Sequence, residues 1–188
     1  MFAKTLITLL LTAAGTLAAP LETRQAPSTY FTPSARYTYN VATGAITPSS
    51  TGLVHQFPSN AGQDVTTLLT FTYPAAAAGK KCQFHFFTEP GSSEVSGSRK
   101  LDVYTSTNPA PGATTGWGPG NQRNVNIGRL GIAASGYATW DATFGAYLTE
   151  LTDCKPAGTV EGFELVGVYD NDLVKWTPPA SGARIAYF

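Results

Sequence analysis

Apolar and polar positions alternate along much of the chain, which is the period-two pattern of β-strands. The longest run covers 65–73, where every second residue from Val65 to Tyr73 belongs to the more apolar of two faces, and Pro74 ends it. A second run, from Lys81 to Thr88, predicts a strand whose two faces carry different side chains. One face holds Cys82, Phe84 and Phe86, and the other holds Gln83, His85 and Phe87.

Further strands are expected at 100–105, 124–132, 136–141, 159–169, 173–176 and 184–188. Clusters rich in Gly, Pro and Ser separate several of them, and such residues are typical of turns. Many short strands without a convincing helical period predict an all-β fold. We therefore expect an antiparallel β-sandwich over residues 52–188, with jelly-roll-like or immunoglobulin-like topology and one disulfide.

One segment also fits a helical turn. Phe144, Tyr147, Leu148 and Leu151 recur at helical spacing behind Asp141, a suitable N-cap. Glycine disfavours helices, so Gly145 favours irregular structure instead.

The first residues are typical of a secretory signal peptide, which we expect to span 1–18. Lys4 precedes a short apolar run and then small residues, so cleavage is expected after Ala18. The run is shorter than the roughly 20 apolar residues of a membrane-spanning helix. The sequence thus predicts a secreted protein, extracellular or associated with the cell wall, that does not span a membrane.

Residues 19–51 form a separate region rich in Ala, Pro, Ser and Thr. Such a composition buries little apolar surface, so much of this region is expected to be mobile, either as a plain linker or as an O-glycosylated or processed arm. The alternation at 36–41 is an exception and predicts a first strand.

The charge of the chain argues against nucleic acid as a partner. The formal net charge is zero and only 13% of the residues are charged, whereas binding to phosphates requires a basic face. A cell-wall polysaccharide or an extracellular protein, met through a neutral polar or aromatic surface, is the expected partner. The oligomeric state is not predicted.

The chain has two cysteines, Cys82 and Cys154. Disulfides persist in oxidising compartments, so we expect these residues to form one, with two separate thiols as the alternative. The bridge is expected to pin the strand at 81–88 to the start of the strand at 159–169, across the sandwich.

The segments around the cysteines, together with several turns, follow a recognisable order: GKKCQFHF at 79–86, SGS at 96–98, WGPGNQR at 117–123, CKPAG at 154–158, and GARIAY at 182–187. Together they resemble the fungal "ubiquitin 3 binding protein But-two, C-terminal" domain family over roughly 52–188. The resemblance implies a small and often secreted protein with no enzymatic residues to carry over. It also implies an intracellular partner, a ubiquitin-like activating enzyme, which the export signal argues against.

The residues offer little for catalysis or metal binding. The two histidines, His55 and His85, are expected on outer sheet faces, and motifs for a nucleophile, a zinc site or a phosphate loop are absent. We therefore expect no cofactor, no metal and no enzymatic activity. Asp170-Asn171-Asp172 has oxygens for calcium, but these residues are also ordinary turn formers.

A pair of carboxylates is the minimum for a glycan-active enzyme. The candidates are Asp102, Asp141, Glu150, Asp153, Glu161 and Glu164. Alternation places Glu161 and Glu164 on opposite faces of one strand. For Glu164, between Phe163 and Leu165, we prefer a position facing solvent over partial burial.

Trp117 is the strongest candidate for ligand binding, because it lies in a Gly/Pro-rich loop where few neighbours are expected to bury it. For the ring itself, however, we prefer a position folded back over the core. Asn121 and Arg123, further along the same segment, complete the candidate site, whereas Trp140 and Trp176 are expected in the core. We favour a noncatalytic binding or surface protein, with a structural wall protein and a glycan-active enzyme as alternatives.

Overall fold

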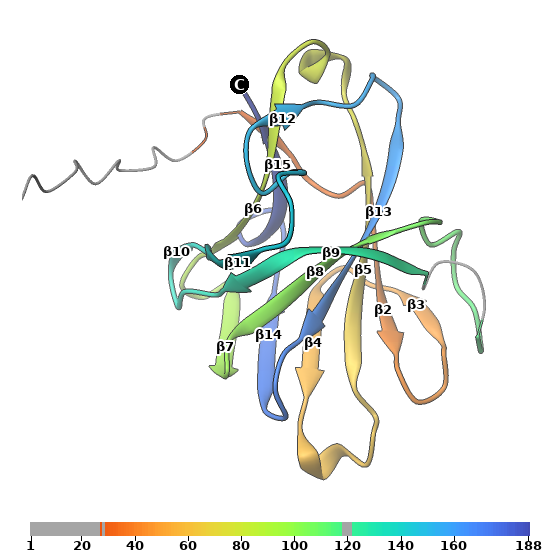
Figure 1. The fold of residues 1–188 in the computed structure, drawn as a ribbon. Coiled ribbons are helices and arrows are strands. Elements are labelled where there is room, and N and C mark those ends of the chain that lie inside the picture. The colour runs from red at the N-terminus through yellow and green to blue at the C-terminus, as the bar shows by residue number, and fades with distance from the viewer. Residues whose placement is uncertain (1–26, 28, 118–121) are drawn as a thin grey trace, which may run out of the picture.

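Two antiparallel sheets pack face to face in the computed structural model, which describes residues 27, 29–117 and 122–188 (Figure 1). The smaller sheet has the order β1 (Tyr30–Phe31), β15 (Gly182–Tyr187), β6 (Lys81–Thr88) and β10 (Gly136–Tyr137). The short β12 (Thr152–Asp153) also pairs with β6. In the described residues the regular helical structure consists of two short 3₁₀ turns, η1 (Pro58–Asn60) and η2 (Ala75–Ala77). The predicted antiparallel β-sandwich is therefore confirmed.

The larger sheet has a branch at its middle. Its main path is β11 (Thr139–Thr143), β9 (Arg123–Gly131), β8 (Lys100–Ser106), β13 (Val160–Gly167), β5 (Val65–Thr72), β4 (Gly52–Gln56), β14 (Asp172–Trp176) and β7 (Ser93–Gly97). Along one edge β5 pairs with β2 (Ala35–Asn40), which continues to β3 (Ile46–Pro48). β4 meets β5 only at its end, through His55 and Val65. The branch of β4, β14 and β7 and the branch of β2 and β3 consequently spread apart on either side of β5 at one end of the molecule (Figure 1).

The core lies between the two sheets and is rich in aromatic side chains. The ring of Phe84 on β6 lies 6.3 Å from Phe71 and 5.6 Å from Phe163, both on the facing sheet. Burial of each such side chain contributes about 1.5–3 kcal/mol to folding. Trp176 is 1% exposed and packs against Phe86, whereas Trp140 is partly buried and packs on the rim of the same core.

The strands with the clearest alternation are observed where the sequence predicted them. β5 covers 65–72 and β6 covers 81–88, with Cys82, Phe84 and Phe86 buried on one face. The strand expected at 136–141 is divided instead, because β10 joins the small sheet and β11 joins the large one.

No helix forms at 144–151, where the chain makes turns. Gly145 has φ of 149°, and Leu148 has φ of 56° with its side chain fully buried. These backbone conformations do not belong to a right-handed helix. The buried side chain of Leu148 fixes the turn against the core, while Phe144 and Leu151 remain exposed.

The sandwich begins earlier than the expected boundary at Gly52. β1, β2 and β3 lie within the region 19–51 that the composition set apart, and β2 pairs with β5 along its whole length. Tyr39 and Ile46, each nearly fully buried, pack with Leu68 in a second small cluster. A few well-placed apolar residues therefore fold a segment whose average composition suggests mobility. The expected signal peptide, 1–18, lies outside the described residues.

Cys82 and Cys154 form the predicted disulfide, with their Cα atoms 4.9 Å apart. Its position differs from the expectation. Cys154 follows β12, which pairs with β6, so the bridge joins neighbouring segments at one side of the small sheet rather than crossing the sandwich to β13. Within the described part of the chain, no helix has the length and apolar character needed to cross a membrane.

Candidate functional site

Trp117 projects into solvent from a fixed base. Trp117 is 73% exposed, so the preferred position of its ring, folded back over the core, is wrong. The rings of Trp117 and Tyr39 meet in a T-shaped contact, with centroids 6.2 Å apart and an angle of 68° between the planes. Behind it lies Gly44, where an added Cβ would come within 2.6 Å of the indole and 2.8 Å of the backbone nitrogen of Trp117. Gly44 also has φ of 72°, a conformation that suits glycine.

The loop before Trp117 is tied to the edge of the large sheet. Thr114 and Ile46 exchange two backbone hydrogen bonds of 2.9 and 3.0 Å, which extends the sheet beyond β3. A shallow groove of about 680 Å³ runs along this junction. We call it the Trp117 groove, and its lining residues are Ile46, Thr47, Ala113, Thr114, Thr115, Gly116 and Trp117. Hydroxyl and apolar groups line it, and none of these seven residues is charged.

Arg123, the third candidate residue, is held in an ion pair. Its Nε and Nη2 donate to Glu164 Oε2 and Oε1 at 2.8 and 2.9 Å, and its guanidinium lies over the ring of Tyr104. These hydrogen bonds raise the pKa of Arg123. Glu164 is fully buried and also accepts from Thr66 Oγ1 at 2.6 Å. The position facing solvent that we preferred for Glu164 is therefore wrong. Asn121 lies outside the described residues.

A second cluster of polar groups was not predicted from the sequence. Glu161 is 7% exposed, and it accepts from Tyr73 Oη at 2.9 Å, from Tyr147 Oη at 2.7 Å and from Lys155 Nζ at 2.6 Å. Burial, and then the hydrogen bond and the charge of Glu161, raise the pKa of Tyr147. Burial and the Glu161 charge raise the pKa of Tyr73 in the same way. Both hydroxyls therefore stay protonated and donate to the carboxylate.

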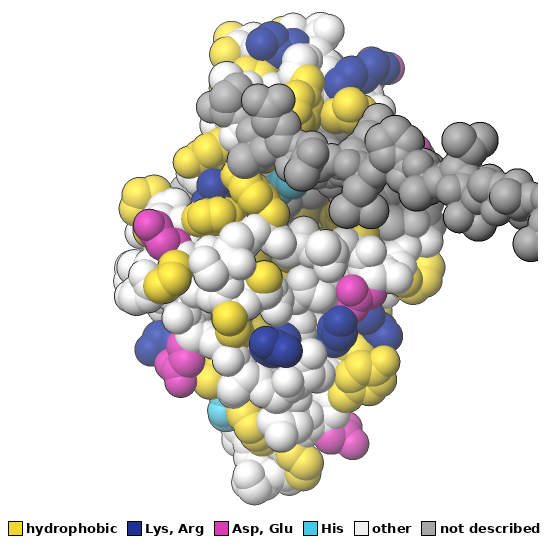
Figure 2. Space-filling view, turned by 90° about the vertical axis from the view of Figure 1, so that its left-hand side faces the viewer, with side chains coloured by type: hydrophobic (Ala, Val, Ile, Leu, Met, Phe, Trp, Pro, Cys, Tyr) yellow, Lys and Arg dark blue, Asp and Glu magenta, His cyan; other side chains and the backbone are white. Residues whose placement is uncertain are grey.

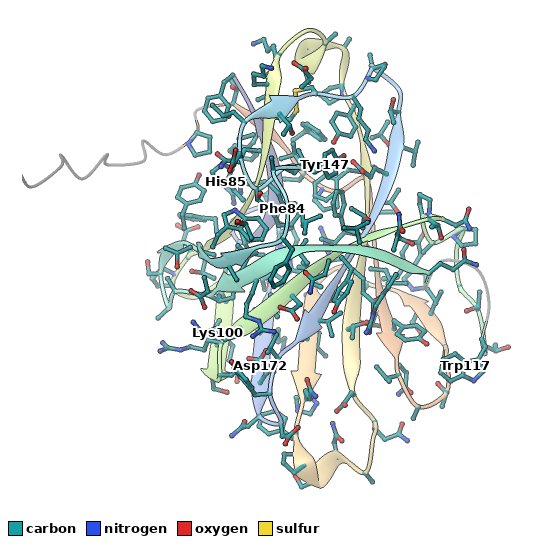
Figure 3. All side chains as sticks on the ribbon, in the orientation of Figure 1. Phe84, His85, Lys100, Trp117, Tyr147 and Asp172 are labelled. Atoms are coloured by element: carbon teal, nitrogen blue, oxygen red, sulfur yellow. A yellow bond between two sulfur atoms is a disulfide. The ribbon has the colours of Figure 1, made fainter. Side chains whose placement is uncertain are left out.

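Glu161 forms part of the wall of an open cleft of about 580 Å³ at one end of the sandwich. We call it the Glu161 cleft. Its lining residues are Thr105, Ser106, Thr107, Pro109, Asn124, Val125, Ile127, Tyr147, Lys155, Val160, Glu161 and Gly162. Figure 3 places Tyr147 well away from Trp117, which lies beyond β3 at the lower right, so the molecule has two separate candidate surfaces.

The remaining candidates do not gather into a site. His85 lies on the outer face of the small sheet, 5.6 Å from the ring of Tyr137, and His55 packs against Phe57. The described residues contain no group of three or more His, Cys, Asp or Glu that would hold a metal ion. On the face shown in Figure 2, basic and acidic side chains are interspersed across a largely uncharged surface.

The position of Asp172 differs from that of an ordinary turn residue. It is fully buried at the start of β14, where its Oδ1 accepts from the backbone N–H of Arg99 at 2.9 Å. Burial raises its pKa to about 6.

Comparison with known families agrees with the resemblance seen in the sequence. A family model described as "Ubiquitin 3 binding protein But2 C-terminal domain" matches residues 41–178. The match begins upstream of Gly52 and includes β3, whereas β1 and β2 precede it. No curated protein sequence matches the chain significantly.

Proposed function

Because the chain belongs to the family of the ubiquitin 3 binding protein But2 C-terminal domain, we propose that it is a noncatalytic binding protein, exported from the cell, that holds a neutral wall polysaccharide in the Trp117 groove. The observation that carries this proposal is the exposure of Trp117 beside Tyr39 and Gly44. At 73% exposure the residue presents apolar ring surface to solvent. Contacts with Tyr39 and Gly44 restrict the orientation of the ring, which lowers the conformational entropy lost on binding.

The chemistry of the groove suits a sugar chain. A sugar ring has an apolar face that packs on an aromatic ring, and its hydroxyls need hydrogen-bond partners at the rim. Thr47, Thr114 and Thr115 supply hydroxyl groups beside the indole. An ionic ligand would find no opposite charge among the seven lining residues, so the groove favours an uncharged one.

Two features support export. The start of the chain has the pattern of a signal peptide. The Cys82–Cys154 disulfide is also of a kind that persists in oxidising compartments. The family description names a ubiquitin 3 binding protein, but an exported chain would not meet an intracellular partner, so we do not propose that partner here.

The buried acids favour binding over catalysis. Glu161 and Glu164 lie on opposite faces of β13, and each is held in an ion pair, with Lys155 and Arg123 respectively. Two carboxylates that hydrolyse a glycoside must instead face the same bond from opposite sides.

The proposal is tested by retention of the mature protein on insoluble chitin and β-glucan. Trp117→Ala should lower retention by about tenfold or more, as expected when a central aromatic contact is removed. Tyr169→Ala is the matched control, because Tyr169 is also exposed, at 64%, but lies on another part of the surface. Equal retention of the wild type and Trp117→Ala on every wall polysaccharide would remove this groove from the function.

A further inference from the structure

The Glu161 cleft has the size and the mixed lining of a small-molecule site. Its volume of about 580 Å³ falls within the roughly 300–1,000 Å³ typical of such sites. Val125 and Val160 are about half exposed on its lining, at 50% and 52%. Residues with hydroxyl, amide and ammonium groups also line the cleft. The cleft is therefore amphipathic, unlike a purely apolar gap between two sheets.

The charged groups of the cleft compensate one another. The Glu161 carboxylate receives donors from Tyr73, Tyr147 and Lys155, and Lys155 Nζ also lies over the ring of Tyr147, 5.2 Å from its centroid. Glu161 uses one of the three N–H donors of the ammonium. The Lys155 side chain is 38% exposed, and Lys155 lines the cleft. The Lys155–Glu161 pair has no net charge, while the ammonium keeps N–H donors for a ligand.

This arrangement selects against ions. An anion that approaches Lys155 also meets the carboxylate of Glu161, and a cation that approaches Glu161 meets Lys155. An uncharged oxygen can accept from Lys155 without either penalty. Val125 and Val160 favour a ligand that also has an apolar face.

We infer that the Glu161 cleft is a second binding site, for an uncharged molecule that carries several hydroxyls and one apolar face, the chemistry of a single pyranose sugar. The ring hydroxyls bond to Lys155, Asn124 and Ser106, and the apolar face lies against Val125 and Val160. This site does not depend on the Trp117 groove.

The disulfide supports this site directly. Cys154 is bonded to Cys82 on β6, and Lys155 is the next residue along the chain. The bridge therefore holds one wall of the cleft in place.

The test uses the intact protein with ¹³C-labelled methyl groups and titrates glucose, galactose, mannose and N-acetylglucosamine. We expect saturable shifts of the Val125, Ile127 and Val160 methyl signals with at least one of these sugars. Glucuronate and glucosamine, which carry a charge on the same ring, should bind more weakly than their neutral counterparts. Stronger binding of a charged sugar, or unmoved methyl signals with every neutral sugar, would overturn the inference.

Two variants locate the site. Val160→Trp fills the cleft from its exposed side and should weaken binding by about tenfold or more, whereas Trp117→Ala should leave the methyl shifts unchanged. The methyl spectrum in the absence of sugar shows whether Val160→Trp is folded. Binding that survives in folded Val160→Trp would contradict the assignment. The two proposals fail separately. If Trp117→Ala loses polysaccharide retention but the methyl signals of the wild type do not move with any neutral sugar, this inference is overturned and the proposed function stands.

Discussion

Arg123 and Glu164 form a two-pronged ion pair on the outer face of the large sheet. The Nε and Nη2 atoms of Arg123 lie 2.8 and 2.9 Å from the two carboxylate oxygens of Glu164. The carboxylate is buried, while the Arg123 side chain is 38% exposed. The pair lies on strands β9 and β13, which β8 separates, so it ties together three strands of the sheet.

Removal of Arg123 should therefore destabilise the fold. Arg123→Ala leaves the buried Glu164 charge with Thr66 as its remaining side-chain partner, and we expect a loss of about 2–3 kcal/mol. This is below the value for a fully buried pair, because water reaches the arginine. Urea unfolding measures the change. Glu164→Gln in the Arg123→Ala background should recover part of the loss, and a loss below about 0.5 kcal/mol for Arg123→Ala would show that the pair contributes little.

Asp172 should make stability depend on pH in the acid range. Burial raises its pKa to about 6 from the 3.8 of an exposed carboxyl. The folded state therefore holds this proton more tightly than the unfolded chain does. The resulting stabilisation is fully present below pH 4 and is lost as the pH rises through 6, to a total of about 3 kcal/mol at most.

Asp172→Asn should abolish this decline. The free energy of unfolding, measured in urea between pH 4 and pH 7, should fall for the wild type relative to Asp172→Asn. Parallel curves for the two proteins would mean that Asp172 titrates in the folded protein as it does when exposed.

Reduction of the disulfide should cost more stability than the loss of a local contact. The bridge joins residues 72 positions apart, for which the chain-entropy model gives about 4 kcal/mol. We expect the midpoint of urea unfolding to fall markedly when reductant is added, and also in the double variant Cys82→Ala/Cys154→Ala. Reduction of the wild type should raise its mass by two hydrogens. An unchanged midpoint would show that the unfolded chain gains little freedom without the bridge.

The sequence predicted those parts of the fold that depend on local alternation. β5 and β6 are clear because each runs for eight residues and three of the four positions on one face are apolar or aromatic. β1 and β12 have two residues each, too few for a period to be seen, and they form because β15 and β6 offer open edges.

The sequence singled out Trp117 as a candidate because of its Gly/Pro-rich loop, but it did not settle whether the ring is exposed. Its contacts with Tyr39 and Gly44 lie more than 70 residues away in the chain and leave no local pattern. Some partners of the buried acids are distant in the chain, since Tyr73 lies 88 residues before Glu161 and Arg123 lies 41 residues before Glu164. One signal was present, however. Glu161 shares its strand face with Phe163 and Leu165, and a carboxylate on an apolar face predicts a buried acid with partners.

The indole N–H signals of the protein report whether a polysaccharide binds at Trp117. The chain has three tryptophans, so the NMR spectrum should contain three such signals, and Trp117→Phe identifies the one at issue. Trp176 is 1% exposed and Trp117 is 73% exposed, so the buried ring serves as an internal reference. On titration with a soluble fragment of a polysaccharide that retains the protein, we expect a saturable shift of the Trp117 signal while the Trp176 signal stays in place. If that fragment binds and the Trp117 signal does not move, Trp117 is not part of the polysaccharide site.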